Sequence, residues 1–488
     1  MKTSDPGATR SGFRYPAAGA ILLLLAAVIL YLTFGRSPAR PNVILISIDS
    51  LRPDHLGCYG YGRDTSPVLD KLAREGVLFE TAVSTSSWTL PAHAALFTSL
   101  PDRVHGCFDD HRWLSDRSRF TVAEAFKKAG YETAGFFSGP YLHSGFGFGQ
   151  GFDMYRDCTS FSEKTMNMLR GGGDSFNWNA LSHKDITNPI VLEEVTAWIE
   201  KNRDGPFFAF IHLWDVHYDY IPPPPYDKMF DGDYTGPVNG RKIHAVHKKP
   251  EDWTPRDVEH LEALYDGEIR WTDHTLGKIL QALECRGYMK DTIIAVTADH
   301  GEAFYEHGHH GHRHTLYEEE IRIPLVIHHP RSIPAGLRIQ HPVQITDIAP
   351  TLLHLAGVSP MPSALGRSLV PLVRDPTIPW PATEAVCELI HTASGVEFFA
   401  MRRPDWKLII NFPTGLIAVF DLDEDPGEKA PLSEEDYPMS AEAFKNLYGK
   451  TARHLQQVLD SLPTIGERDT PAFSKMTKAQ LRSLGYLK

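Results

Sequence analysis

Residues 42–49 read NVILISID, an unbroken run of β-branched and other apolar residues that ends in an acid. The run is too short for an ordinary helix, and it lacks the apolar–polar alternation of a strand with one solvated face. Such runs are typical of strands buried on both faces of a parallel sheet. Working outward, we expect similar strands at PFFAFIHL (206–213), TIIAVTAD (292–299) and IPLVIHH (323–329).

Helices are predicted between these strands. The segment SPVLDKLAREG (66–76) has Pro at the first helical position and Gly at its end. Thr121 and Glu124 form a capping box ahead of a second helix, and longer helical patterns cover 188–202 and 255–287. Strands that alternate with helices predict an α/β fold with a large, mostly parallel sheet flanked by helices.

The pattern changes after residue 375. Two strand-like runs, 407–412 and 417–422, are joined by a short turn, and a helix is expected at 440–460. We therefore expect an α/β domain at 41–375 and a small α+β subdomain at 376–488.

The N-terminal region contains an apolar run of 18 residues at 17–34, preceded by Lys2, Arg10 and Arg14. This length and charge pattern predict a signal anchor that spans the membrane, with the N-terminus in the cytoplasm. Residues 1–40 would then comprise a cytoplasmic segment, the anchor and a linker. The rest of the chain would lie outside the cytoplasm, in the periplasm or the extracellular space, unless the segment is cleaved.

Composition excludes several classes of protein. The 488 residues carry a net charge of −12, which argues against nucleic acid as a partner. Five cysteines without C-x-x-C spacing predict neither a zinc knuckle nor a dense disulfide framework. The sequence does not exclude one disulfide bond, and it does not indicate which two cysteines would form it. Nothing in the sequence indicates an oligomeric state.

Acids and imidazoles follow three of the predicted strands. Asp49 ends the first, Asp299 and His300 follow the second, and the third runs into His212, Asp215 and His217. Ligands of open α/β sheets bind beyond the carboxyl ends of the strands. Oxygen ligands combined with imidazole predict a divalent ion such as Mn, Mg or Zn at this edge.

A hydroxyl group is predicted near the same edge. In SSWTLPAHAALFTSL (86–100), Thr89 begins a helix whose first turn contains Pro91. A helix N-terminus favours an anion, and a nearby metal ion can activate a hydroxyl group as a nucleophile. Local sequence alone favours a capping role for Thr89.

The His-rich tract at 300–314 lacks the H-E-x-x-H pattern, which disfavours a metalloprotease.

Several stretches, taken together and in this order, resemble the sulfatase family of the alkaline phosphatase superfamily. They are PNVILISIDSLRPDHLGCYGY, SSWTLPAHAALFTSLPDRVHG, TADHGEAFYEHG, TLYEEEIRIPLVI, TDIAPTLLHLAG and GRSLVPL. The resemblance implies a mixed, mostly parallel sheet flanked by helices, a small C-terminal subdomain, and metal-dependent cleavage of anionic esters.

Departures from the family pattern shape the functional prediction. Sulfatases carry C-x-P-x-R or S-x-P-x-R and convert the Cys or Ser to formylglycine; this chain has Thr89 and His93 at those positions. Ser50 replaces the second acid of the family's Asp-Asp pair, which removes one calcium ligand. A Thr nucleophile resembles phospho-transferring relatives such as lipoteichoic acid synthases, phosphoethanolamine transferases and nucleotide phosphodiesterases.

The resulting hypothesis is a hydrolase or transferase that cleaves phosphate mono- or diesters through a covalent intermediate on Thr89. The substrate would be a small anionic ester or a lipid or glycan headgroup. The expected ligands of one divalent ion (Mn, Mg, Zn or Ca) are Asp49, Thr89, Asp299 and His300. The expected catalytic residues are Thr89, His93 and His217, and the expected substrate-binding residues are His93, His217, His312 and His314. A second metal ion would use Asp215, His312 and His314.

Two alternatives remain open at this point. One is hydrolysis of sulfate esters by an unmodified Thr89. The other is a non-catalytic, membrane-anchored binding protein on the same scaffold.

Overall fold

The computed structural model describes residues 40–108, 114, 119–159, 186–201, 205–241, 243, 253–380, 384–391 and 395–462. The fold described below is that of the compact unit 41–488. The predicted anchor at 17–34 lies outside the described residues. No helix within the described ranges is long and apolar enough to cross a bilayer.

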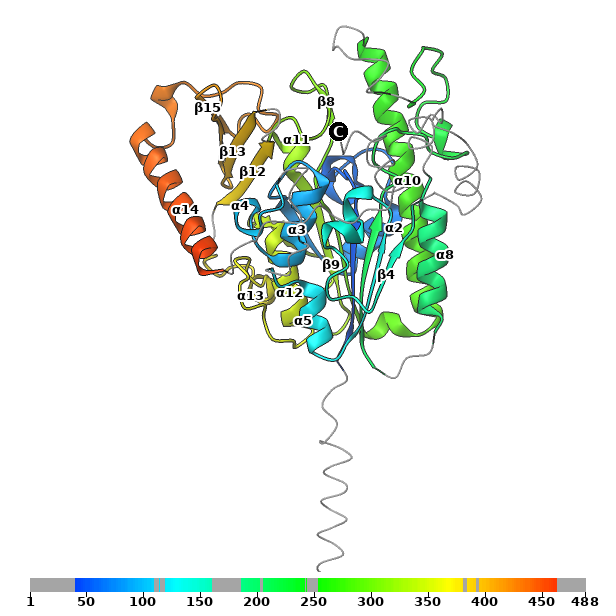
Figure 1. Ribbon diagram of the computed structural model, residues 1–488. Coiled ribbons are helices and arrows are strands. Elements are labelled where there is room, and N and C mark those ends of the chain that lie inside the picture. Colours follow the sequence, from blue (N-terminus) through cyan, green and yellow to red (C-terminus); the bar gives the residue numbers. More distant parts are fainter. Residues whose placement is uncertain are drawn as a thin grey trace, which may run out of the picture. The chain divides into compact units, whose positions relative to one another are not determined.

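A nine-stranded sheet forms the centre of the unit 41–488, in the order β10-β2-β9-β6-β1-β5-β3-β4, with β11 paired to β2 (Figure 1). β9 runs antiparallel to β6 and β2, and the other pairs are parallel. The predicted large, mostly parallel sheet is thus confirmed. The strands are β1 Asn42–Ile48, β2 Val77–Val83, β3 Glu132–Phe137, β4 Met154–Asp157, β5 Phe207–Leu213, β6 Thr292–Ala298, β9 Arg322–His328, β10 Leu337–Ile339 and β11 Val343–Gln344.

β1 lies at the middle of this sheet, between β5 and β6, with Val43 to Ile46 fully buried. In the register of the three strands, Ile48 lies opposite both Leu213 and Ala298. The residues that follow each strand therefore leave the sheet together at one edge. This register brings Asp49 and Asp299 next to each other.

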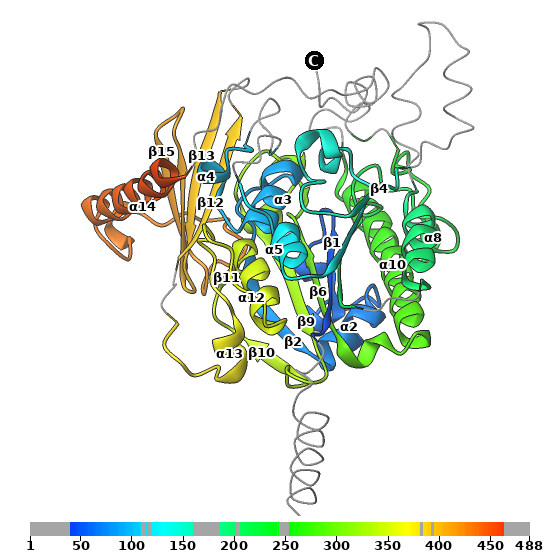
Figure 2. The same ribbon diagram turned by 60° about the horizontal axis from the view of Figure 1, so that its bottom comes forward.

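Two groups of helices cover opposite faces of the sheet (Figure 2). One group is α2 Pro67–Arg74, α8 Asn188–Ile199 and α10 Pro255–Cys285, and the other is α3 Thr89–Thr98, α5 Val122–Lys128 and α12 Ile348–Leu355. The predicted capping box of Thr121 and Glu124 is present at the start of α5. The pattern at 255–287 forms the single helix α10, which has its own capping box.

Shorter elements connect these layers. The short helices are α4 Asp102–His105, α11 Glu318–Ile321 and α13 Val370–Arg374, and a small hairpin pairs β7 Ala303–Phe304 with β8 His310–Gly311. The 3-10 turns are η1 Pro53–His55, η2 Gly57–Tyr59, η3 Pro140–Leu142, η4 Ser144–Phe146, η5 Tyr226–Lys228, η7 Tyr288–Asp291, η8 Ile345–Asp347 and η9 Glu434–Asp436.

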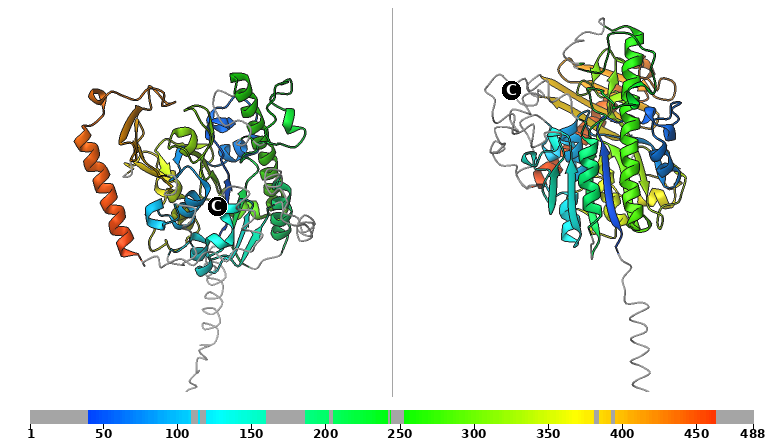
Figure 3. Two further views of the ribbon diagram at one scale, coloured as in Figure 1. Left: turned by 45° about the horizontal axis from the view of Figure 1, so that its top comes forward. Right: turned by 90° about the vertical axis from the view of Figure 1, so that its right-hand side faces the viewer.

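The C-terminal part forms a second, antiparallel sheet in the order β12-β13-β14-β15. Its strands are β12 Ala385–His391, β13 Val396–Arg402, β14 Trp406–Asn411 and β15 Leu416–Asp421. Helix α14, Ala441–Ser461, runs alongside this sheet (Figure 3, left). Phe444 of α14 packs in a small core with Trp406. The predicted hairpin at 407–422 corresponds to β14 and β15.

Candidate active site and metal centre

Asp49, Asp299 and His300 form a buried cluster just beyond the ends of β1 and β6, and all three are fully buried. The Ser50 amide donates a hydrogen bond to Asp299 Oδ1 at 3.2 Å, which ties the two strand ends together. Each of the three side chains offers one ligand atom, and these atoms lie within 4.8 Å of one another. The cluster therefore has the size and the donor atoms of a metal site.

The hydrogen bonds of the cluster also favour a cation. Nδ1 of His300 is 2.8 Å from the Gly301 carbonyl oxygen, and because a carbonyl only accepts, Nδ1 carries the hydrogen. In the neutral imidazole, Nε2 then has only its lone pair, 3.3 Å from Asp299 Oδ2 and 3.7 Å from Asp49 Oδ1. Asp299 Oδ2 is buried and accepts no hydrogen bond from the described residues. Three electron-rich atoms that face one another in this way fit a divalent ion.

Thr89 lies beside this cluster. It is the first residue of α3 and 5% exposed, and its Oγ1 is 3.3 Å from His300 Nε2. The N-cap position of α3 is occupied by Trp88, so Thr89 does not have the capping role that its local sequence favoured. The hydroxyl group instead faces a predicted metal ligand.

His93 lies one helical turn after Thr89 and is fully buried. Its Nδ1 donates to the Thr89 carbonyl oxygen at 2.9 Å, so Ser47 Oγ donates to Nε2 at 3.0 Å. Burial lowers the pKa of His93 to about 3, although the nearby Asp299 raises it. We expected His93 to neutralise substrate charge. The structure instead places a neutral imidazole that supports the Thr89 backbone.

The sequence placed His212, the penultimate residue of β5, at this edge of the sheet but gave it no individual role. The Gly139 amide donates to its Nδ1 at 3.3 Å, so Nε2 carries the hydrogen and donates to Asp49 Oδ2 at 3.2 Å. Burial lowers the pKa of His212 to about 4, which keeps the ring neutral at pH 7. His212 therefore orients Asp49. The signal in the sequence was an imidazole inside an otherwise apolar strand.

His217 and His312 meet above the cluster. Their ring centroids are 5.0 Å apart, and the His312 ring is 4.3 Å from that of His300. Nδ1 of His312 is 3.0 Å from Glu302 Oε1, which fixes the orientation of the ring. The structure thus brings two of the expected substrate-binding imidazoles to the metal ligands.

The residues expected around a second metal ion do not converge. Asp215 Oδ1 accepts hydrogen bonds from Thr187 at the start of α8, and Oδ2 accepts one from Trp271 Nε1 at 3.1 Å. His314 is exposed, and its ring lies 4.9 Å from the His309 ring at an interplanar angle of 55°. Within the described ranges, the cluster of Asp49, Asp299 and His300 is the one group of three or more His, Cys, Asp or Glu side chains that could hold a metal ion.

Comparison with known proteins agrees with this geometry. The sequence model of the sulfatase family matches residues 41–358, and a model described as N-sulphoglucosamine sulphohydrolase, C-terminal, matches 305–456. The chain belongs to the sulfatase family. It is therefore an ester hydrolase of a metal-dependent family, and its buried cluster is the group suited to the metal ion.

Among the relatives of this sulfatase-family chain is an arylsulfatase of Clostridium perfringens (strain 13 / Type A). It is 26% identical, and the match covers 82% of this chain and 91% of the relative. An N-acetylglucosamine-6-O-sulfatase of Bacteroides thetaiotaomicron is 23% identical over 86% of each chain. The phosphonate monoester hydrolase of Agrobacterium radiobacter has the same fold, with a TM-score of 0.69 and 24% identity over 86% of this chain and 96% of the other.

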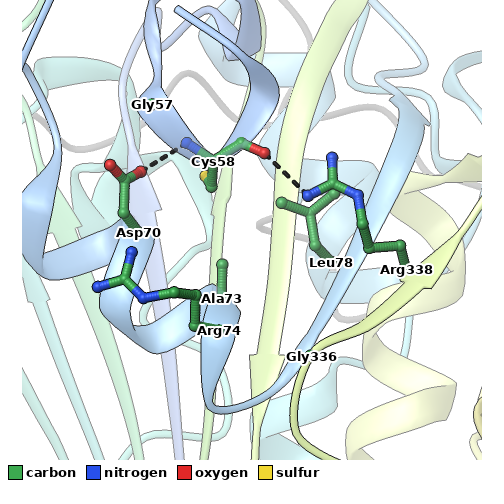
Figure 4. Close-up of a pocket in the computed structure, with 8 residues that line it drawn as sticks. All are labelled: Gly57, Cys58, Asp70, Ala73, Arg74, Leu78, Gly336 and Arg338. Atoms are coloured by element: carbon green, nitrogen blue, oxygen red, sulfur yellow. Dashed lines mark hydrogen bonds between the residues drawn. The ribbon is translucent and has the colours of Figure 1, made fainter.

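A surface pocket of about 310 Å³ lies elsewhere on this sulfatase-family fold (Figure 4). It is lined by Gly57, Cys58, Asp70, Ala73, Arg74, Leu78, Gly336 and Arg338. Asp70 accepts a hydrogen bond from the Cys58 amide at 2.7 Å, and Arg338 donates to the Cys58 carbonyl oxygen at 3.1 Å. The pocket shares no residue with the metal cluster.

Proposed function

We propose that this sulfatase-family enzyme cleaves phosphate mono- or diesters through a covalent intermediate on Thr89. The observation that carries the proposal is the position of Thr89 Oγ1, at the start of α3 and 3.3 Å from His300 Nε2. The family places its modified Cys or Ser at this position, and this chain has an unmodified hydroxyl group there.

The chemistry of Thr favours phosphorus over sulfur. When sulfate is bound to the formylglycine hydrate, the sulfate group leaves by elimination. A sulfate ester of Thr has no such route. A phosphothreonine can be resolved by attack of water, or of an acceptor alcohol, at phosphorus. The first turn of α3 adds backbone N–H groups that favour an anion beside Thr89.

The side chains divide the work as follows. A divalent ion held by Asp49, Asp299, His300 and the Thr89 oxygen would supply the positive charge that lowers the pKa of the hydroxyl group. Oγ1 of Thr89 forms the bond to phosphorus as the bond to the leaving alcohol breaks. His217 and His312 bind the non-bridging oxygens, and one of them donates a proton to the alcohol.

Hydrolysis of sulfate esters is the second candidate, and the names of the relatives favour it, since they include arylsulfatases and a glycan sulfatase. The same names suggest a glycan headgroup as substrate. A non-catalytic binding protein is not supported, because the family is enzymatic and the metal ligands and a hydroxyl group are retained.

A comparison of substrates tests the proposal. The full-length protein is assayed with Mn²⁺, Mg²⁺, Zn²⁺ or Ca²⁺ on nitrophenyl phosphate, bis-nitrophenyl phosphate, a nitrophenyl phosphonate and nitrophenyl sulfate. We expect the highest kcat/KM on a phosphate ester. Nitrophenyl sulfate as the best substrate would overturn the proposal.

Substitution of Thr89 tests the nucleophile. Thr89→Ala should lower kcat at least about 1,000-fold, because the covalent step is lost. Thr98→Ala is the matched control, since Thr98 lies on the same helix and its hydroxyl donates to the Ala94 carbonyl oxygen. Mass spectrometry of acid-quenched enzyme should find a phosphate on Thr89. A Thr89→Ala enzyme with undiminished activity would exclude the nucleophile.

We also propose that residues 17–34 anchor the enzyme in the membrane, with the catalytic unit in the periplasm or the extracellular space. The support is the apolar run of 18 residues with Lys2, Arg10 and Arg14 before it. The protein should stay in the membrane fraction after carbonate extraction and keep its first residues. N-terminal sequencing that begins near residue 37 would show cleavage instead.

A further inference from the structure

A single arginine joins two loops of the active site. The Arg313 amide donates to the Ser87 carbonyl oxygen at 2.9 Å. The guanidinium carbon of Arg313 lies 4.0 Å from the centroid of the Trp88 ring, and Nη1 donates to the Tyr141 hydroxyl at 3.3 Å. The Trp88 and Tyr141 rings also meet edge to face, with centroids 5.3 Å apart. Trp88 and Tyr141, from two segments distant in sequence, therefore both contact the guanidinium group of Arg313.

Two residues of this contact, Trp88 and Arg313, are direct neighbours of the proposed catalytic residues. Trp88 immediately precedes Thr89, and Arg313 immediately follows His312. Trp88 and Arg313 both lie just outside regular secondary structure, because α3 begins at Thr89 and β8 ends at Gly311. The contacts of Arg313 thus connect the loop before α3 with the loop after β8, which helix α3 and the β7–β8 hairpin do not connect to each other.

The backbone at Arg313 supports a positional role. Its φ is 70°, a left-handed conformation that is uncommon for residues other than Gly, Asn and Asp. The His312 side chain contacts Glu302 and His300, and the Arg313 side chain contacts Trp88. Strained backbone of this kind is retained where the surrounding contacts require it, often at active sites.

We propose that Arg313, Trp88 and Tyr141 form a clamp that positions Thr89 relative to His312. The clamp rests on the proposed roles of these two catalytic residues. Arginine suits the task because its planar group stacks on an indole ring and donates a hydrogen bond in the ring's vicinity, and lysine offers only a point charge. Arg313 is thus a positioning residue, which acts on the reaction through the two loops.

Steady-state kinetics on the best of the four nitrophenyl esters tests the clamp. Arg313→Ala should lower kcat about tenfold with KM changed less than about threefold, because small misplacements of reacting groups slow the chemical step. Arg313→Lys should recover part of the loss, since it retains a cation over Trp88. Assays are run well below the melting temperature of each variant.

A double-mutant cycle separates the clamp from a general loss of structure. Tyr141→Phe should lower kcat about threefold in the wild-type background and have no effect in the Arg313→Ala background, because its hydroxyl acts through Arg313. Arg403→Ala is the matched control, since Arg403 stacks 5.6 Å from the Trp406 ring in the C-terminal sheet. This control should leave kcat unchanged.

Three results would overturn the clamp. They are an unchanged kcat in Arg313→Ala, a tenfold rise in KM with kcat unchanged, which would indicate direct substrate contact, and additive effects in the cycle. Thr89→Ala is measured in parallel. An active Thr89→Ala enzyme would reject the nucleophile and with it the positioning of Thr89, even if Arg313→Ala is impaired. An inactive Thr89→Ala enzyme with an unimpaired Arg313→Ala enzyme would reject only the clamp.

Discussion

Replacement of His212 is expected to weaken metal binding although His212 does not lie in the ligand cluster. Its Nε2 donates to Asp49 Oδ2 at 3.2 Å, and the amide of Gly139 fixes the tautomer. A hydrogen bond to a charged group contributes about 1.5–3 kcal/mol, and each 1.4 kcal/mol corresponds to a factor of about ten. His212→Leu should therefore raise the Kd for the metal ion about 10–100-fold, the range typical for the partners of metal ligands.

A buried histidine elsewhere in the fold provides a close control. His105 is also buried, its Nδ1 accepts from the Cys107 amide at 2.9 Å, and its Nε2 lies 3.3 Å from Asp102 Oδ1. His105→Leu removes the same kind of contacts at a place without metal ligands. Both variants should lose a comparable amount of folding free energy. A difference between them in metal affinity can then be attributed to the contact between His212 and Asp49.

The assay is calorimetric titration of Mn²⁺ or Zn²⁺ into the chelator-treated full-length protein. We expect weaker binding in His212→Leu and unchanged binding in His105→Leu. The reasoning fails if both variants bind the metal ion within twofold of the wild type. It also fails if both lose affinity equally, because the effect would then come from general destabilisation.

Other predictions concern stability and metal dependence. Lys407→Met should lower the free energy of unfolding by about 3–5 kcal/mol in urea denaturation, because Lys407 Nζ is buried 3.2 Å from Glu318 and 2.9 Å from Glu428, whose carboxylates would lose their partner. Burial raises the pKa of Glu318, but the charges of Lys407, Arg402 and Arg322, together with the hydrogen bond from Lys407, outweigh burial and lower that pKa to about 2. The stability that the Glu318–Lys407 pair contributes is therefore complete above pH 4.5 and is lost as the pH falls towards the lowered pKa of Glu318. Thermal melts at pH 6 and pH 3 should show this loss in the wild type and a smaller loss in Lys407→Met. Thr121→Ala should cost about 1 kcal/mol through loss of the capping box with Glu124, measured by the same denaturation. A chelator should abolish ester hydrolysis and an added divalent ion should restore it; activity that persists after complete metal removal would contradict the site.

The central strands and the metal ligands could be predicted from short stretches of sequence. A run such as 42–49 is mostly apolar because both of its faces are buried, and this property is local. Parallel strands have their carboxyl ends at one edge, so acids after two strands are expected to meet. Asp49, Asp299 and His300 follow from this rule, and the structure brings them together.

Side chains whose roles depend on distant partners were not predictable in this way. Asp215 also follows a strand closely, two residues after β5, but α8 begins beside it and its carboxylate accepts the hydrogen bonds of Thr187. His93 occupies the position of a family Arg, and burial keeps it neutral. The difference lies in which segment packs against each residue.

By itself, the sequence determined the mostly parallel sheet, the sulfatase family and the hydroxyl group at position 89, since each depends on a local pattern. Only the tertiary structure decided the tautomer of His300, the hydrogen bond from His212 to Asp49 and the contact between Arg313 and Trp88. These last two contacts join residues 163 and 225 positions apart, respectively. Hydrogen-bond direction and ring stacking are set by the packing of such distant segments, and no local pattern encodes that packing.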